Sequence, residues 1–174
     1  MADDEVRRAI DAIRRGEPAI LPTDTVYGLV ASPYRQGPTA RLYRLKGREG
    51  AKPTALIAAS VDMLFECVPE LRGRAGVMAR ALLPGAYTLV LPNPARRYRW
   101  LTGTRPDAIG VRVPELPQQA RLVTDAIGCL VATSANDPGE PAAATVAEIP
   151  QRIRDGCGAI VDIGDAVGII AAQS

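Results

Sequence analysis

The chain has 174 residues, of which 47% are apolar, enough for one sizeable hydrophobic core and too many for a disordered chain. It contains no histidine, which excludes Ser-His-Asp and Cys-His catalytic sites and imidazole metal sites. The net charge of +2 is too small to argue for nucleic-acid binding by itself. Neither a membrane-length apolar run nor a signal peptide is present, so we expect a cytoplasmic protein without a membrane partner.

Helices and short strands alternate along the whole chain. The first helix has an aspartate N-cap at Asp3 or Asp4, an apolar stripe at helical spacing, and Gly16 at its C-terminal end. Further helices are predicted at 38–45, 61–67, 71–82, 118–127 and 145–154, and strands at 19–21, 54–59, 87–91, 109–113, 129–132 and 159–163. Residues 23–28 are predicted as a turn and 92–106 as a loop. This alternation predicts a single α/β domain over residues 1–174, with some antiparallel strand pairs.

The three cysteines, Cys67, Cys129 and Cys157, are far apart and form no CxxC pair. Their spacing indicates neither a disulfide framework nor a zinc site. We therefore expect reduced, small core residues at all three positions.

Both lysines of the chain lie in one short segment, whereas the other nineteen basic residues are arginines. Lys46, Arg48 and Lys52 fall within seven residues that also contain two glycines, between a predicted helix and a predicted strand. Guanidinium and ammonium groups beside a backbone that can approach a ligand closely suit a triphosphate. The segment has no Walker A spacing, and a solvated basic turn is an equally good interpretation.

Four further segments carry polar groups beside predicted strands, and ligands of α/β proteins bind beyond the carboxyl ends of strands. Residues 22–29, PTDTVYGL, offer hydroxyl and carboxylate groups, or simply a turn that closes the strand. Residues 84–88, PGAYT, form a turn in which only Thr88 stands out. Arg112 interrupts an apolar strand, either as an outward residue of a half-exposed strand or, as the apolar flanking positions favour, to pair with a ligand or another charge. Residues 133–136, TSAN, could form an anion-binding turn or an ordinary one.

A separate stretch at residues 96–100, RRYRW, interleaves three arginines with two aromatic residues. Such a pattern can stack on and neutralise nucleic acid. The simpler interpretation, a solvated loop, is favoured.

Taken together, in order and spacing, the five segments resemble the YrdC-like family. The family motif PT(D/E)TVYGL matches residues 22–29, KxR matches the segment at 46–53, and PGP(Y/F/L)T matches residues 84–88. The motif (V/I)R(V/M)P matches residues 111–114, and SAN matches the segment at 133–136. Ala86 and Pro138 depart from the family pattern, as do residues 164–174, which lack a Ser-Thr-Val-Val-Asp strand. The resemblance implies a YrdC-like twisted mixed β-sheet flanked by helices, with a concave basic substrate cleft.

The resemblance also implies an activity: L-threonine, bicarbonate and ATP would give threonylcarbamoyl-AMP and pyrophosphate, for tRNA threonylcarbamoyladenosine modification. The enzyme would be a nucleotidyltransferase, with Mg²⁺ brought by ATP rather than held by the protein. The resemblance assigns catalysis to Lys46 and Arg48, which would also bind ATP. It adds Thr88, Ser134 and Asn136 to the ATP site, and assigns threonine or bicarbonate to Thr23, Lys52 and Arg112.

The resemblance leaves two other functions open. One is a non-enzymatic RNA-binding relative of the same fold, and the other is a carbamoyl-transfer domain like those of hydrogenase maturation proteins. The expected partners of the synthase are its three substrates, a downstream tRNA threonylcarbamoyl-transferase complex and, weakly, RNA or tRNA.

Overall fold

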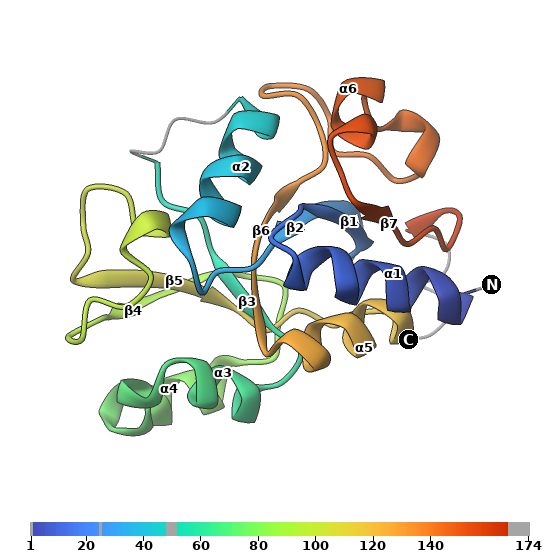
Figure 1. Cartoon of the computed structure of the whole chain (residues 1–174). Coiled ribbons are helices and arrows are strands. Elements are labelled where there is room, and N and C mark those ends of the chain that lie inside the picture. The colour runs from blue at the N-terminus through green and yellow to red at the C-terminus, as the bar shows by residue number, and fades with distance from the viewer. Residues whose placement is uncertain (1, 25, 48–51, 167–174) are drawn as a thin grey trace.

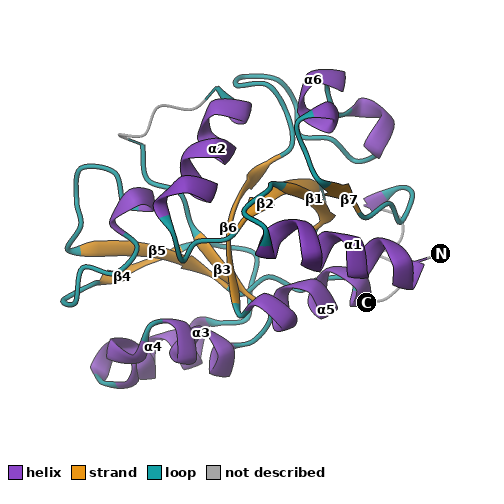
Figure 2. Cartoon of the chain, viewed as in Figure 1, coloured by secondary structure: helices purple, strands orange, loops and turns teal. Residues whose placement is uncertain are grey.

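The computed structural model describes residues 2–24, 26–47 and 52–166. Within these ranges, seven strands form one mixed sheet in the order β4-β5-β3-β6-β2-β1-β7 (Figure 2). The strands are β1 (Ala19–Pro22), β2 (Tyr27–Ala31), β3 (Leu56–Ala58), β4 (Leu89–Pro92), β5 (Ala108–Arg112), β6 (Cys129–Ser134) and β7 (Ala159–Ile160). The helices are α1 (Ala2–Arg14), α2 (Gln36–Lys46), α3 (Val61–Cys67), α4 (Arg74–Leu82), α5 (Gln118–Ile127) and α6 (Gln151–Asp155). The predicted mixed sheet with flanking helices is confirmed.

Helices cover both faces of the sheet, and each covered face has its own apolar core. On one face α1 and α5, which lie side by side in Figure 1, bury Val6, Ile13 and Val123 against the strand residues Val30 and Leu130. Because these side chains are almost completely removed from water, each aliphatic group contributes about 1.5–3 kcal/mol to folding.

The opposite face packs against the other four helices. Leu42 of α2, Leu64 of α3, Ala79 of α4 and Ile153 of α6 belong to one buried cluster with strand residues such as Leu29. In the strands β1, β2, β3 and β6, alternate side chains therefore belong to different cores, as the period of two requires.

The face that α1 and α5 cover continues beyond these helices. In β6, Leu130 is buried beneath them, and the same face is followed by Ala132 and then Ser134. Across the ladder, Ser134 is opposite Gly28 of β2. On the other side of β6, Ile57 of β3 is paired with Arg112 of β5. Small and polar residues thus replace the aliphatic core where the helices end.

Strand β2 was not among the predicted elements, because its first residues were assigned to a turn. The turn is shorter than predicted: the Thr23 N–H donates to the Val26 carbonyl at 2.8 Å, and the chain enters β2 at Tyr27. All five residues of β2 are buried between β1 and β6. The segment is therefore a β-hairpin that places a central strand in the sheet.

The predicted helix at 145–154 is wrong. Val146–Glu148 form a single 3₁₀ turn, and α6 begins only at Gln151. Between them, Ile149 is extended, with φ −73° and ψ 132°, because Pro150 disfavours a helical conformation in the residue before it. The predicted helix at 71–82 is likewise divided at Gly73 into a 3₁₀ turn, Pro69–Arg72, and α4.

Strand ends also differ from the prediction. Strand β6 extends two residues further, to Ser134, because β2 supplies ladder partners there. Strand β7 has only two residues, and the chain then turns so that the Ile163 N–H reaches the Tyr27 hydroxyl at 2.9 Å. None of the helices in the described part of the chain is both long and apolar enough to cross a membrane.

Candidate functional site

Two adjoining pockets lie at the end of β6, and Thr133 and Ser134 line both of them. The first, of about 360 Å³, is lined by Thr23, Asp24 and Arg112. The second, of about 340 Å³, is lined by both lysines of the chain and by Asn136. The end of β6 thus separates a half with two lysines from a half with one carboxylate and one guanidinium.

Lys46 ends helix α2 and is buried, with 6% of its surface exposed. Its ammonium contacts the Ser134 and Asn136 carbonyl oxygens at 2.8 and 2.7 Å, the Ser134 hydroxyl at 3.3 Å, and the Asn136 Oδ1. An ammonium has three donors, so these oxygens can use all of them. Lys46 therefore fastens the turn after β6 to the end of α2, while it also lines the pocket.

The turn after β6 has further bonds of its own. The Ser134 hydroxyl donates to Asn136 Oδ1 at 2.6 Å, and the Asn136 amide donates to the Glu140 carbonyl. Asn136 is 9% exposed. The predicted pair Ser134 and Asn136 thus forms one rigid polar corner with Lys46.

Of the other two predicted cations, Lys52 lies within the described residues and Arg48 does not. Lys52 has an exposed side chain and lines the same pocket as Lys46. Arg48 lies outside the described residues. Gly47, with φ +72°, ends α2 in the left-handed conformation that glycine adopts without strain, and it lines the same pocket.

Arg112 and Asp24 form an ion pair in the other pocket, with 3.4 Å between Nη2 and Oδ2. Their side chains are 29% and 19% exposed, so both remain accessible to a small ligand. The pair joins β5 to the turn between β1 and β2, across the intervening β3 and β6. This contact accounts for a charge on an otherwise apolar strand, which the sequence had singled out.

Thr23 closes the same turn, since its hydroxyl donates to the Val26 carbonyl at 2.7 Å. It packs against Gly28, where an added Cβ would lie only 2.9 Å from Thr23 Cγ2. Gly28 therefore leaves room for the Thr23 side chain beside the pocket that Thr23 and Ser134 both line.

Thr88 lies apart from the other predicted ATP-binding residues. It lines a third pocket, of about 280 Å³, together with Pro53, Thr54 and Gly110. This pocket is on the same sheet face, since Gly110 is two residues before Arg112 in β5. The structure therefore brings Lys46, Lys52, Ser134 and Asn136 together, and Thr23 with Arg112 beside them, but places Thr88 in a neighbouring pocket.

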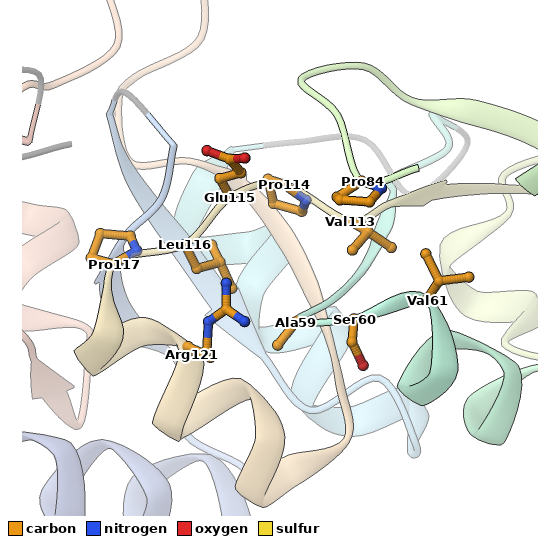
Figure 3. A pocket seen from close by; sticks show the side chains of 10 residues that line it. All are labelled: Ala59, Ser60, Val61, Pro84, Val113, Pro114, Glu115, Leu116, Pro117 and Arg121. Atoms are coloured by element: carbon orange, nitrogen blue, oxygen red, sulfur yellow. The ribbon is translucent and has the colours of Figure 1, made fainter. Parts of the chain in front are cut away.

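Figure 3 shows a fourth pocket, of about 410 Å³, beyond the carboxyl ends of the parallel strands β3 and β5. Pro84, Val113 and Pro114 line it, and Arg121 of α5 extends its guanidinium over it. Pro114 also lines the pocket of Arg112, so the two cavities share a wall. No predicted site residue lines this fourth pocket.

Several residues of the site were not predicted. Ile57 and Ala132 form an apolar part of the Arg112 pocket. The alternation of β3 and β6 could have identified them, once the strands were known to be neighbours. Tyr27 is fully buried, and its hydroxyl donates to the Gly164 carbonyl at 2.8 Å. Burial raises the pKa of Tyr27 to about 12, so it stays a neutral structural link.

The arginine-rich loop at 96–100 holds its aromatic residues against the protein. The Tyr98 hydroxyl donates to the Cys67 carbonyl at 2.6 Å, and the Trp100 indole N–H donates to the Pro33 carbonyl at 2.7 Å. Both side chains have a structural partner, which the sequence pattern did not indicate.

Comparison with known proteins identifies the family. Residues 11–172 match the Sua5/YciO/YrdC family, described as "Telomere recombination". The threonylcarbamoyl-AMP synthase of Halorhodospira halophila is 38% identical over 144 residues, covering 83% of this chain and 75% of that protein. That of Xanthomonas euvesicatoria is 33% identical, covering 91% and 85%.

A solved structure supports the same family assignment. The crystal structure of Pyrococcus abyssi Sua5 complexed with L-threonine superposes with a TM-score of 0.80 at 30% identity. It covers 92% of this chain, which in turn spans 47% of the longer Sua5 chain. With the family match over nearly the whole length, the chain belongs to the Sua5/YciO/YrdC family.

Proposed function

We propose that this chain is an L-threonylcarbamoyladenylate synthase of the tRNA threonylcarbamoyladenosine pathway. The observation that carries the proposal is the pair of adjoining pockets that share Thr133 and Ser134. One offers the exposed Lys52 ammonium for a phosphate, and the other offers a guanidinium and a carboxylate for an amino acid. The relatives named threonylcarbamoyl-AMP synthase support the same conclusion.

In the proposed reaction, the threonine amine and bicarbonate form a carbamate and release water. A carbamate oxygen then attacks the α-phosphorus of ATP, and pyrophosphate leaves. No proton has to be removed by a strong base at the phosphorus, so positioning and charge neutralisation carry the catalysis. This requirement fits a chain that has no histidine.

The described residues suggest which side chain binds which part of the substrates. Arg112 would bind the threonine carboxylate, exchanging its 3.4 Å contact with Asp24 for a ligand oxygen. Lys52, whose side chain is exposed, would bind a phosphate or the carbamate. Lys46 would hold the Ser134 corner in place, so that the Ser134 hydroxyl and nearby amides face the nucleotide.

Mg²⁺ would enter with ATP. Among the described residues no group of three or more His, Cys, Asp or Glu side chains could hold a metal ion, and Asp24 is paired with Arg112. We expect the phosphates and water to hold the ion, where it would neutralise the charge of the leaving pyrophosphate.

Pyrophosphate release tests the proposal. We expect release from ATP and Mg²⁺ only when both L-threonine and bicarbonate are present, with threonylcarbamoyl-AMP detected by mass spectrometry. Release with carbamoyl phosphate instead would indicate the carbamoyl-transfer function. No release from folded protein, together with RNA binding, would indicate the RNA-binding function.

A matched pair of arginine variants tests the amino-acid pocket. Arg112→Gln should lower kcat/KM for threonine about 10- to 100-fold, since a hydrogen bond to a charged group is worth about 1.5–3 kcal/mol. Arg74→Gln, at an exposed position at the start of α4, should leave it unchanged. Equal activity of the two variants would refute the assignment of Arg112.

A further inference from the structure

The fold brings together two cysteines that are far apart in the sequence. Cys67 is the last residue of α3 and Cys129 the first of β6, and the Tyr34 hydroxyl contacts the sulfur of the first and the backbone N–H of the second. The Cys67 sulfur also packs against the chain just before Cys129, since an added Cβ on Gly128 would lie 3.5 Å from it.

Tyr34 holds this arrangement from a third element. Its hydroxyl oxygen lies 3.6 Å from Cys67 Sγ and accepts the Cys129 backbone N–H at 2.9 Å. The same hydroxyl donates to the Ile127 carbonyl at 2.7 Å. One phenol therefore fixes both cysteines relative to the loop between α5 and β6.

The two thiols differ in access and in acidity. Cys67 is partly exposed, whereas Cys129 is completely buried. The neighbouring Cys129 thiol lowers the pKa of Cys67 most. Burial opposes this shift, the Tyr34 hydroxyl assists it, and the charge of Glu66 opposes it. The same thiol pairing, together with burial, raises the pKa of Cys129. Tyr98 donates its hydroxyl to the Cys67 carbonyl, and burial raises the pKa of Tyr98, so it stays neutral.

We propose that Cys67 and Cys129 are an oxidisable dithiol that closes into a disulfide when a hydroperoxide reaches Cys67. The Cys67 thiolate attacks the terminal peroxide oxygen, the O–O bond breaks, and a sulfenic acid and an alcohol (water, from hydrogen peroxide) are formed. The Cys129 sulfur then attacks the Cys67 sulfur, the S–S bond forms, and water leaves with the thiol proton. Two thiols and one peroxide thus give one disulfide, one alcohol and one water.

Cys157 provides an internal control. It is partly buried just after α6, and burial raises its pKa to about 12, so very little thiolate is present at neutral pH. A peroxide that reacts by thiolate chemistry should therefore oxidise Cys67 and spare Cys157.

The test is oxidation of the full chain by hydrogen peroxide, followed by intact-mass and peptide mass spectrometry. We expect a loss of about 2 Da, consistent with closing one disulfide, a peptide that links Cys67 to Cys129, and recovery of both thiols with dithiothreitol. The rate should rise with pH as the thiolate fraction of Cys67 rises. No ATP or threonine is needed, so failure here would leave the proposed synthase activity untouched.

Variants separate the two steps. In Cys129→Ala the sulfenic acid should persist at Cys67 and be trapped by dimedone, and in Cys67→Ser no linked peptide should form. Oxidation of Cys157 at the same rate as Cys67, or an intact wild-type mass after exposure that oxidises free cysteine, would overturn the proposal. Peptide mapping of the wild-type chain decides the question even where a variant fails to fold.

Discussion

Replacing Lys46 with methionine tests whether its ammonium is part of the folded framework. Methionine keeps most of the length of the side chain but leaves the Ser134 and Asn136 carbonyl oxygens without their donor. Hydrogen bonds to a charged group contribute about 1.5–3 kcal/mol each, and the cost of burying the ammonium offsets part of their sum. We expect Lys46→Met to lower the free energy of unfolding by about 3 kcal/mol.

Urea denaturation followed by circular dichroism measures this loss. With a slope of about 2 kcal/mol/M, the midpoint should fall by about 1.5 M. The matched control is Lys52→Met, which removes the other lysine of the same pocket from an exposed position and should change stability by less than about 0.5 kcal/mol. If both variants unfold at the wild-type urea concentration, the ammonium of Lys46 does not bind these oxygens in solution, and the structural role argued here is refuted.

Three further changes have defined outcomes. Gly28→Ala should push Thr23 out of place and lower stability by about 1–3 kcal/mol, with a raised KM for threonine in the pyrophosphate assay. Ser60→Ala removes the N-cap of α3 and should cost about 1 kcal/mol in urea denaturation, with unchanged activity. The hydrogen bond from Arg97 lowers the pKa of Glu70 in the folded protein. The ion pair between these two residues therefore stabilises the fold at pH values above the unfolded pKa of about 4.3. This stabilisation is lost as the pH falls through the lower pKa of the folded state. Thermal melts from pH 6 to 3 should show this loss, and Glu70→Gln should remove that part of the slope; an equal slope in the variant would contradict the pairing.

Elements with a strong local signal were predictable from the sequence. Strand β1 and helix α5 were located within a residue of their bounds, because proline, glycine and helical spacing mark them. Strand β2 was not, since Tyr27–Ala31 follows a polar turn and its identity depends on partners in β1 and β6 that are distant in sequence. Pro150 carries enough information to divide the last predicted helix, because a proline disfavours a helical conformation in the residue before it.

The candidate site was predictable as a set of residues more than as an arrangement. The sequence placed Lys46 and Ser134 in one functional group, and the structure brings them into contact. That the ammonium is buried against protein oxygens follows from how α2 packs against the end of β6, which no local pattern reveals. Thr88 was predicted to belong to the same group, but it lies in a separate pocket. Its neighbours there are determined by the position of β4 at the edge of the sheet.

The pairing of Gly28 with Ser134 has an evolutionary consequence. Because strand residues alternate between faces, losing or gaining one residue within β2 or β6 would exchange the residues of the open face for those of the core. Chain length in these two strands is therefore expected to be invariant among functional descendants of this sequence. The edge strand β4 has a neighbouring strand on one side only, so an insertion there or in the loop that follows disturbs fewer contacts. We therefore expect insertions to accumulate in these segments first.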